Sequence, residues 1–142
     1  MGRIMAIDYG NKRVGIAVTD SLQLIANGLT TVHSNEIFDF LTNYLVKENV
    51  ECIVIGEPKR LNNQPSDSSR FIDPFVKAVH KKFPNVLIER MDERFTSKMA
   101  FQTMIDGGLK KKSRRNKELV DQISATLILQ SFLEKKSNEG RF

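Results

Sequence analysis

Three acidic residues are spaced along the chain where their carboxylates could do chemistry together. Asp8 ends one apolar run, Glu93 follows another, and Asp121 lies early in a long, largely apolar segment near the C-terminus. Converging carboxylates repel one another unless cations bridge them, and hard oxygen ligands favour Mg²⁺ or Mn²⁺ over zinc. Two such ions about 4 Å apart can stabilise the attacking and leaving oxygens of phosphodiester hydrolysis. The acids therefore indicate metal-dependent hydrolysis.

Each of these acids also has a purely structural explanation. Asp8 can open a turn by accepting hydrogen bonds from the amides that follow it. Glu93 can pair with a neighbouring arginine on the surface, and Asp121 can favour the positive end of a helix. Asp92 competes with Glu93 for the middle position, and spacing does not separate the two. The catalytic interpretation therefore depends on whether the fold brings the acids together.

The apolar pattern predicts the elements that would position them. Short apolar runs predict strands at about 3–8, 14–18, 25–32, 52–55 and 86–91. Helical spacing predicts helices at about 35–45, 71–83, 96–105 and 119–136, the first capped by Ser34 or Asn35 and the third by Thr96 or Ser97. The predicted order is β-β-β-α-β-α-β-α-α.

This order predicts an α/β fold in a single domain over residues 1–136, with a frayed tail at 137–142. The first strands form an antiparallel meander, whereas helical crossovers make the later strands parallel to the first. A mixed five-stranded sheet with helices on both faces results. Asp8 and Glu93 then emerge at the edge formed by the carboxyl ends of parallel strands, where ligands gather. A last helix packed across the sheet would bring Asp121 to them.

Positive charge is concentrated in one short segment. The chain carries 22 basic and 17 acidic residues, a net charge of +5, yet six of the basic residues fall within eight positions. This basic segment comprises Lys110, Lys111, Lys112, Arg114, Arg115 and Lys117. Such clustering is the electrostatic footprint of a protein that binds a phosphate backbone. The alternatives are a solvated loop or a surface for anionic lipid.

The remaining composition indicates a cytoplasmic protein that uses no membrane. The 142 residues, 40% of them hydrophobic, suit one core, and no apolar stretch approaches the roughly 18 residues of a membrane span. We see no signal peptide. Cys52 is the single cysteine and stands in an apolar run, so we expect an inert core thiol and no Cys-rich zinc site. His33 and His80 are expected on the surface.

Four segments carry a resemblance to a known family. They are IDYGNKRVG at 7–15, VIGEP at 54–58, DERFTS at 92–97, and VDQ at 120–122 followed by ILQSFL at 128–133. In this order, over residues 3–133, they resemble the YqgF family. Its members are described as pre-16S rRNA nucleases and, under the name RuvX, as Holliday-junction resolvases.

The resemblance implies a ribonuclease-H-like fold and a three-acid metal site at Asp8, Glu93 and Asp121, which favours Glu93 over Asp92. It further implies a divalent metal, Mg²⁺ or Mn²⁺, and an endonuclease that acts on structured RNA, maturing the 5′ end of 16S rRNA in a ribosomal precursor particle. Many relatives have Gly-Leu-Pro-Leu and an Asp-Gly turn where this chain has GEPKRLNN at 56–63. This departure leaves substrate choice open. Besides the basic segment, the candidates for nucleic-acid binding are Lys12, Arg13, Lys59 and Arg60.

Other functions remain as alternatives at this stage. A resolvase of branched DNA cuts two strands symmetrically and would normally be a dimer. No sequence feature marks a dimer interface, so we expect a monomer or weak homodimer, a mild argument for RNA. The Asp-Tyr-Gly hairpin is also typical of sugar kinases and actin-like ATPases, which need two lobes and a longer chain. A non-catalytic RNA-binding assembly factor would be expected to lack one of the acids, and all three are present.

Overall fold

The computed structural model describes residues 2–57, 69–92 and 117–139, with the side chains at 57, 69–71 and 92 left out. Several predicted features lie outside the described residues. They are Glu93, Lys59, Arg60, the helix expected at 96–105, and the basic segment up to Arg115.

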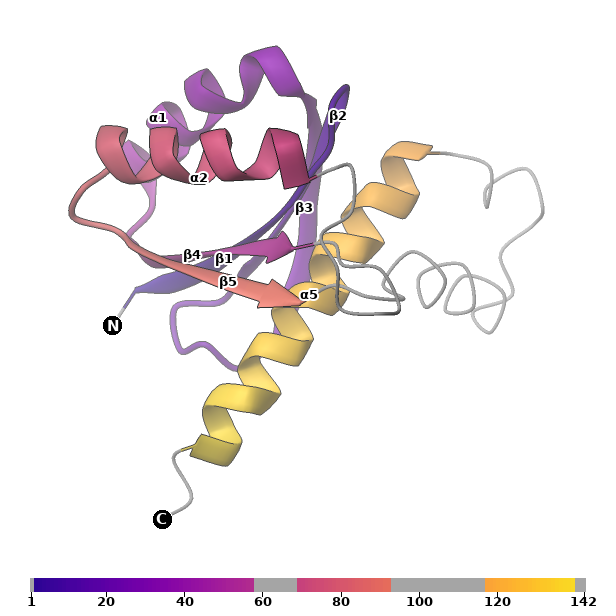
Figure 1. Cartoon of the computed structure of the whole chain (residues 1–142). Helices are drawn as coiled ribbons and strands as arrows, with labels where there is room; N and C mark the ends of the chain where they lie inside the picture. Colours follow the sequence, from indigo (N-terminus) through magenta and orange to yellow (C-terminus); the bar gives the residue numbers. More distant parts are fainter. Residues whose placement is uncertain (1, 58–68, 93–116, 140–142) are drawn as a thin grey trace.

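The five strands form one sheet in the order β3-β2-β1-β4-β5 (Figure 1). Their bounds are β1 Arg3–Tyr9, β2 Arg13–Thr19, β3 Ala26–His33, β4 Val50–Glu57 and β5 Leu87–Asp92. β1 pairs with β2, and β2 with β3, in antiparallel fashion, whereas β1, β4 and β5 run parallel to one another. The predicted mixed five-stranded sheet is confirmed.

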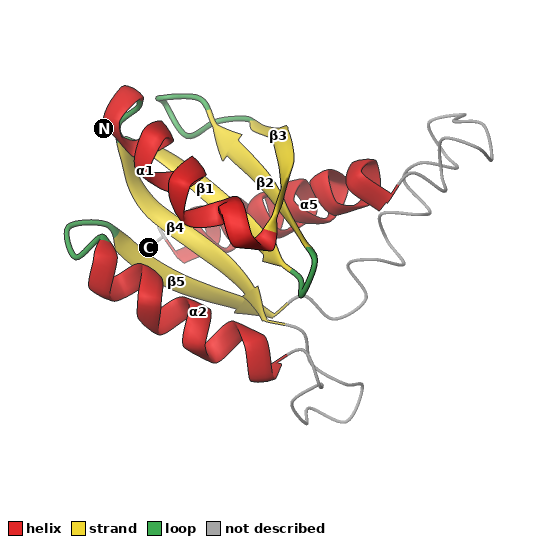
Figure 2. Ribbon diagram, turned by 90° about the horizontal axis from the view of Figure 1, so that it is seen from above, coloured by secondary structure: helices red, strands yellow, loops and turns green. Residues whose placement is uncertain are grey.

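Helices cover both faces of this sheet (Figure 2). On one face lie α1 (Ile37–Lys47), which follows a short 3₁₀ turn at Ser34–Glu36, and α2 (Ser69–Lys82). The long helix α5 (Lys117–Glu139) crosses the other face, packing against β1, β2 and β3 and touching β4. This arrangement confirms the prediction of helices on both faces.

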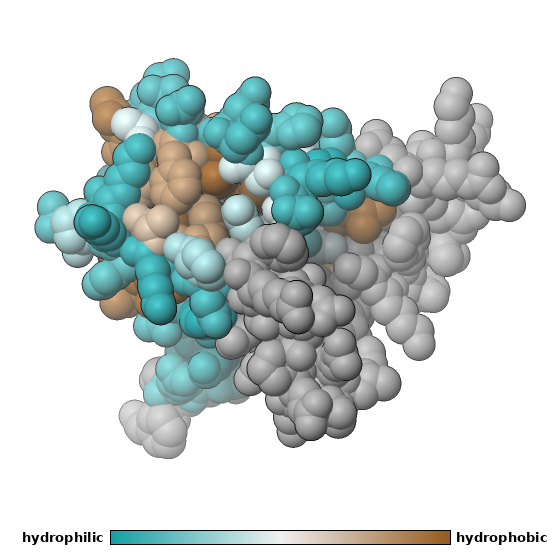
Figure 3. All heavy atoms as spheres, turned by 45° about the horizontal axis from the view of Figure 1, so that its top comes forward, coloured by the Kyte–Doolittle hydropathy of each residue, from teal (hydrophilic) through white to brown (hydrophobic). Residues whose placement is uncertain are grey.

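Alternation along the strands divides the core into two layers, and this division decides which way Asp8 faces. In β1, Met5 and Ile7 join the layer beneath α1 and α2, whereas Ile4 and Ala6 join the layer beneath α5. Asp8 is the next residue on the α5 side. Figure 3 looks onto the side that carries α1 and α2, where apolar atoms form a patch surrounded by hydrophilic residues.

Two predicted helix ends differ from the structure. Neither Ser34 nor Asn35 caps α1, which begins at Ile37 without a side-chain cap hydrogen bond. The Ser34 hydroxyl instead donates to the carbonyl of Asn11 at 2.7 Å, tying the end of β3 to the turn between β1 and β2. At the C-terminus, α5 continues to Glu139, so residues 137–139 are helical although fraying was expected. Lys136 in the last turn is favourable for the helix dipole there.

Within the described ranges, no helix is long and apolar enough to cross a membrane.

Candidate active site

A glycine on β2 allows α5 to bring Asp121 to Asp8. Asp8 lies near the carboxyl end of β1 and is the direct cross-strand partner of Gly15. A Cβ atom at Gly15 would lie 2.5 Å from the carbonyl carbon of Asp121 and 3.0 Å from its Cβ. Since real side chains do not tolerate such contacts, only glycine lets the helix backbone cross β2 here.

The carboxylates of Asp8 and Asp121 therefore share one side of the sheet. Directly opposed residues of an antiparallel pair have Cβ positions about 5 Å apart, so both acids lie within reach of the space above Gly15. Both residues are only partly exposed. Oxygen donors at this spacing suit Mg²⁺ or Mn²⁺, which take carboxylates and waters as ligands. The structure thus brings Asp121 to Gly15, the strand partner of Asp8, and a shared metal site at the two acids stays a prediction.

A buried hydroxyl adds to the polar character of this side of α5. Ser124 lies one helical turn beyond Asp121 and is 1% exposed. Its Oγ is the one buried side-chain oxygen or nitrogen of the described residues that has no hydrogen-bond partner. A buried polar atom of this kind normally has a partner, which an ion or its water can provide. This hydroxyl is compatible with a hydrated divalent cation held by the two carboxylates.

Arg13 forms an ion pair with one of the two acids. Its guanidinium Nε donates to Oδ2 of Asp121 at 2.8 Å. Arg13 opens β2 two residues before Gly15, so alternation puts both on the α5 side. The sequence suggested Arg13 for nucleic-acid binding, and nothing in the sequence pointed to this ion pair, whose members are 108 positions apart.

The other predicted site residues are only partly covered by the described structure. Lys12 is exposed in the turn between β1 and β2, beside Arg13. Glu93, the preferred third acid, lies outside the described residues and directly follows Asp92, the last residue of β5. β5 runs parallel to β4 and β1, so its carboxyl end points the same way as theirs (Figure 1). No group of three potential metal ligands occurs among the residues that are described.

Three residues that sequence reasoning missed determine the position of α5. They are Gly15, Gly28 and Thr31. Besides Gly15, Gly28 on β3 lies against Gln122 and Thr126, and a Cβ added at Gly28 would lie 3.3 Å from the Thr126 hydroxyl oxygen. The Thr31 hydroxyl donates to the carbonyl of Glu118 at 2.7 Å. Glycine inside a strand is the signal that could have indicated close backbone approach.

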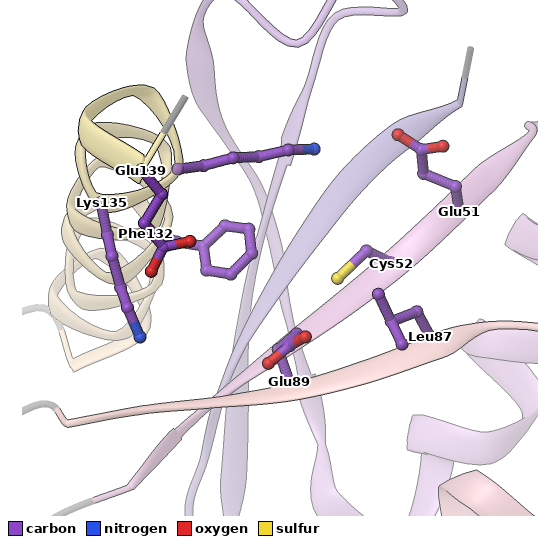
Figure 4. A pocket seen from close by; sticks show the side chains of 8 residues that line it. Glu51, Cys52, Leu87, Glu89, Phe132, Lys135 and Glu139 are labelled. Carbon is purple, nitrogen blue, oxygen red and sulfur yellow. The ribbon is translucent and has the colours of Figure 1, made fainter. Parts of the chain in front are cut away.

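A pocket of about 370 Å³ lies at the opposite end of the sheet, away from the acids. It is lined by Glu51, Cys52, Leu87, Glu89, Phe132, Lys135, Lys136 and Glu139, from the first halves of β4 and β5 and the end of α5 (Figure 4). Burial raises the pKa of the Cys52 thiol to about 11, so the thiolate is scarce at neutral pH. Cys52 is buried, as the sequence predicted.

A comparison with known protein families identifies the family of this chain. Residues 2–135 match the model of the RuvX family, described as Holliday junction resolvase. The chain belongs to the RuvX family. Similar RuvX-family proteins include two named "Putative pre-16S rRNA nuclease", from Phocaeicola vulgatus and Flavobacterium psychrophilum. Each is 60% identical over 136 residues, which cover 96% of this chain and 98% and 99% of the relatives.

Two solved structures of RuvC are similar in fold to this RuvX-family chain. The structure of T. thermophilus RuvC in complex with Holliday junction substrate aligns with a TM-score of 0.59 and 16% identity, covering 97% of each chain. A second structure of Thermus thermophilus RuvC aligns with a TM-score of 0.56 and 16% identity, covering 96% of each. The fold is therefore ribonuclease-H-like, as the sequence resemblance implied. The RuvX-family protein is a nuclease, a phosphodiester hydrolase.

Proposed function

We propose that this RuvX-family protein is a metal-dependent endonuclease that cleaves structured RNA and matures the 5′ end of 16S rRNA within a ribosomal precursor particle. Its relatives at 60% identity carry the pre-16S rRNA nuclease name. The observation that supports the proposal is the close approach of Asp121 on α5 to Gly15, which is the strand partner of Asp8.

In this proposal Asp8, Asp121 and Glu93 hold Mg²⁺ or Mn²⁺. Bound there, the metal would polarise the scissile phosphate and lower the pKa of a water nucleophile. The chain's own contribution is positional. β1 fixes Asp8 within a paired strand, and the packed first turns of α5 fix Asp121, so both carboxylates are held before the substrate arrives. Glu93 is included on the family resemblance and on its place in the sequence after β5.

Basic residues would hold the phosphate backbone next to these acids. Lys12 is exposed in the turn beside the site, and Lys117 is exposed at the start of α5, one turn before Asp121. A lysine at a helix N-terminus is unfavourable for the helix dipole, which suggests a use other than helix stability. We propose that Lys12, Arg13, Lys59, Arg60 and the basic segment form the substrate track.

A second candidate function is the resolution of branched DNA, which the description of the matching family model favours. Both reactions hydrolyse phosphodiesters at the same acids, so the candidates differ in substrate and in symmetry. A resolvase cuts two strands at a four-way junction and would act as a dimer. We propose instead a cytoplasmic monomer or weak homodimer, with residues 1–136 as one nuclease domain. A non-catalytic assembly factor is a third alternative, and retention of the acids argues against it.

The test is a direct comparison of substrates. Purified protein is incubated with precursor 16S rRNA and with a four-way DNA junction, each with Mg²⁺ and with Mn²⁺, beside Asp8→Asn as the inactive control. We expect wild type alone to cut the RNA at discrete positions. Symmetric cleavage of the junction with intact RNA would favour the resolvase, and binding without cleavage of either substrate would favour the assembly factor. Sedimentation of the free protein measures the oligomeric state independently.

A further inference from the structure

The ion pair between Arg13 and Asp121 places a protein cation at the position where the proposed function requires a metal ion. Arg13 Nε and Asp121 Oδ2 are 2.8 Å apart, and the two side chains are 33% and 21% exposed. Both residues sit on rigid elements, Arg13 at the start of β2 and Asp121 in the packed part of α5. The pair is therefore not a chance meeting of two loose surface side chains.

Arg13 also lies diagonally across the strand pair from Asp8. Asp8 is the partner of Gly15, and Arg13 precedes Gly15 by two residues on the same face. Diagonal neighbours of this kind lie about 7–8 Å apart, within the reach of a long side chain. A guanidinium at this position lowers the electrostatic cost of holding carboxylates side by side.

We propose that Arg13 is a resident counter-cation of the acid site, which occupies Asp121 in the metal-free protein and which the metal must displace. This inference rests on the proposed function, because it assumes that Asp121 is a metal ligand. Because Arg13 Nε bonds Oδ2 of Asp121, its positive charge would compete with a metal ion for the same carboxylate. With a metal ion held at Asp121, the Arg13 guanidinium would leave this ion pair and would be available to a substrate phosphate.

The first experiment measures metal affinity without nucleic acid. Mn²⁺ binding is titrated by electron paramagnetic resonance for wild type, Arg13→Gln, Lys12→Gln and Asp8→Asn. Arg13→Gln removes the competing cation, so we expect it to bind Mn²⁺ about 3- to 10-fold more tightly than wild type. Lys12→Gln is the matched control for metal affinity, because it removes the same charge from the adjacent exposed position without touching an ion pair. It should change the affinity less than twofold.

Each outcome separates the inference from the function on which it rests. If wild type binds Mn²⁺ no better than Asp8→Asn, the proposed metal site itself is wrong. If wild type binds and Arg13→Gln binds equally or more weakly, the counter-cation inference alone is overturned. An equal gain in Arg13→Gln and Lys12→Gln would also overturn it, because general charge would then explain the effect.

A second measurement on the wild-type protein does not depend on the folding of the glutamine variant. The Nε–H resonance of Arg13 is followed by nuclear magnetic resonance and assigned by its loss in Arg13→Lys, which keeps the positive charge. We expect saturating Mg²⁺ to shift this resonance and to speed its exchange with solvent, and Asp8→Asn to suppress both changes. An Arg13 signal that stays unchanged while wild type binds Mg²⁺ would contradict displacement and leave Arg13 a structural link between β2 and α5.

Discussion

At the scale of single residues, the two described acids have different surroundings. Asp121 lies on α5 and accepts a hydrogen bond from Arg13, and Asp8 lies in a paired strand opposite Gly15. The asparagine variants keep nearly the same side-chain shape while removing the charge that binds a metal. Mutating a residue that only hydrogen-bonds a metal ligand typically lowers metal affinity or activity by about 10- to 100-fold. We therefore expect Asp8→Asn and Asp121→Asn, which change proposed ligands themselves, to lower cleavage by about 100-fold or more.

The control for this prediction lies on the other side of the sheet. Asp39 is exposed on α1 and takes no part in the acid site, so Asp39→Asn should cleave within about twofold of wild type. Circular dichroism checks that all three variants are folded. A folded Asp8→Asn protein with wild-type cleavage would contradict the three-acid site.

At the scale of elements, the contact between α5 and β2 sets the geometry of the site. Replacing Gly15 by alanine forces the backbone of α5 away at Asp121, because the new Cβ overlaps main-chain atoms that cannot rotate aside. Overpacking of this kind lowers the free energy of unfolding by about 1–3 kcal/mol. For Gly15→Ala we expect a loss at the upper end of this range, together with a loss of cleavage. Denaturant unfolding and cleavage assays measure the two effects.

Gly28 provides the matched comparison for Gly15. A Cβ there approaches the Thr126 hydroxyl oxygen at 3.3 Å and meets side-chain atoms only. Gly28→Ala should therefore cost less stability than Gly15→Ala and leave cleavage largely intact. Equal losses in both variants would indicate that α5 does not have to approach β2 closely at Asp121.

The stability of the connection between β2 and β3 should depend on pH through Asp20. The backbone amides of Ile25, Leu24 and Leu22 donate to the Asp20 carboxylate at 2.8, 2.8 and 3.1 Å. These hydrogen bonds, that of Ile25 foremost, hold the pKa of Asp20 below its usual 3.8. A lowered folded-state pKa means that the stabilisation is complete above pH 3.8 and is lost as the pH falls through the folded-state value.

Asp20→Asn tests this assignment by thermal unfolding. The variant should melt below wild type at pH 7, and the difference in Tm should narrow as the pH is lowered below 3.8. A difference that stays constant down to pH 2 would mean that the charge of Asp20 is not what stabilises the connection.

The role of the basic segment can be tested by measuring nucleic-acid affinity at increasing salt concentrations. Each phosphate contact releases counterions, so the logarithm of affinity falls with the logarithm of salt by about 0.7–0.9 per contact. We expect joint replacement of Lys111, Lys112, Arg114 and Arg115 by glutamine to flatten this slope by about two to four units, with little change in stability. An unchanged slope would leave Lys12, Arg13, Lys59 and Arg60 as the candidates for the track.

At the scale of the whole molecule, cleavage should require a divalent cation, because the described part of the site offers carboxylates and no thiol. Mg²⁺ or Mn²⁺ should support turnover, and EDTA should abolish it. Ca²⁺ has a larger and looser coordination shell, so it should support substrate binding with little cutting. Cleavage and gel-shift assays with the three ions separate the two steps, and equal cleavage in EDTA would rule out the mechanism.

The sequence by itself determined the mixed sheet and the edge of the sheet at which we expect the chemistry. Local patterns carry this information, because short apolar runs define strands and helical crossovers make β1, β4 and β5 parallel. The position of Asp8 at the carboxyl end of β1 followed from the same reasoning. The family motifs added Glu93 and the nuclease assignment, which spacing had left undecided.

Only the tertiary structure decided how α5 lies on the sheet and what Asp121 contacts. Gly15 and Asp121 are far apart in the chain, and their approach depends on side-chain packing along the whole length of α5. The same holds for Arg13, assigned from charge alone to the substrate and found bonded to Asp121. The Ser34 hydroxyl likewise donates to the Asn11 carbonyl in the turn between β1 and β2, although its local sequence predicted a helix cap. Long-range contacts of this kind leave no periodic trace in a single sequence, because they join residues whose neighbours along the chain are unrelated.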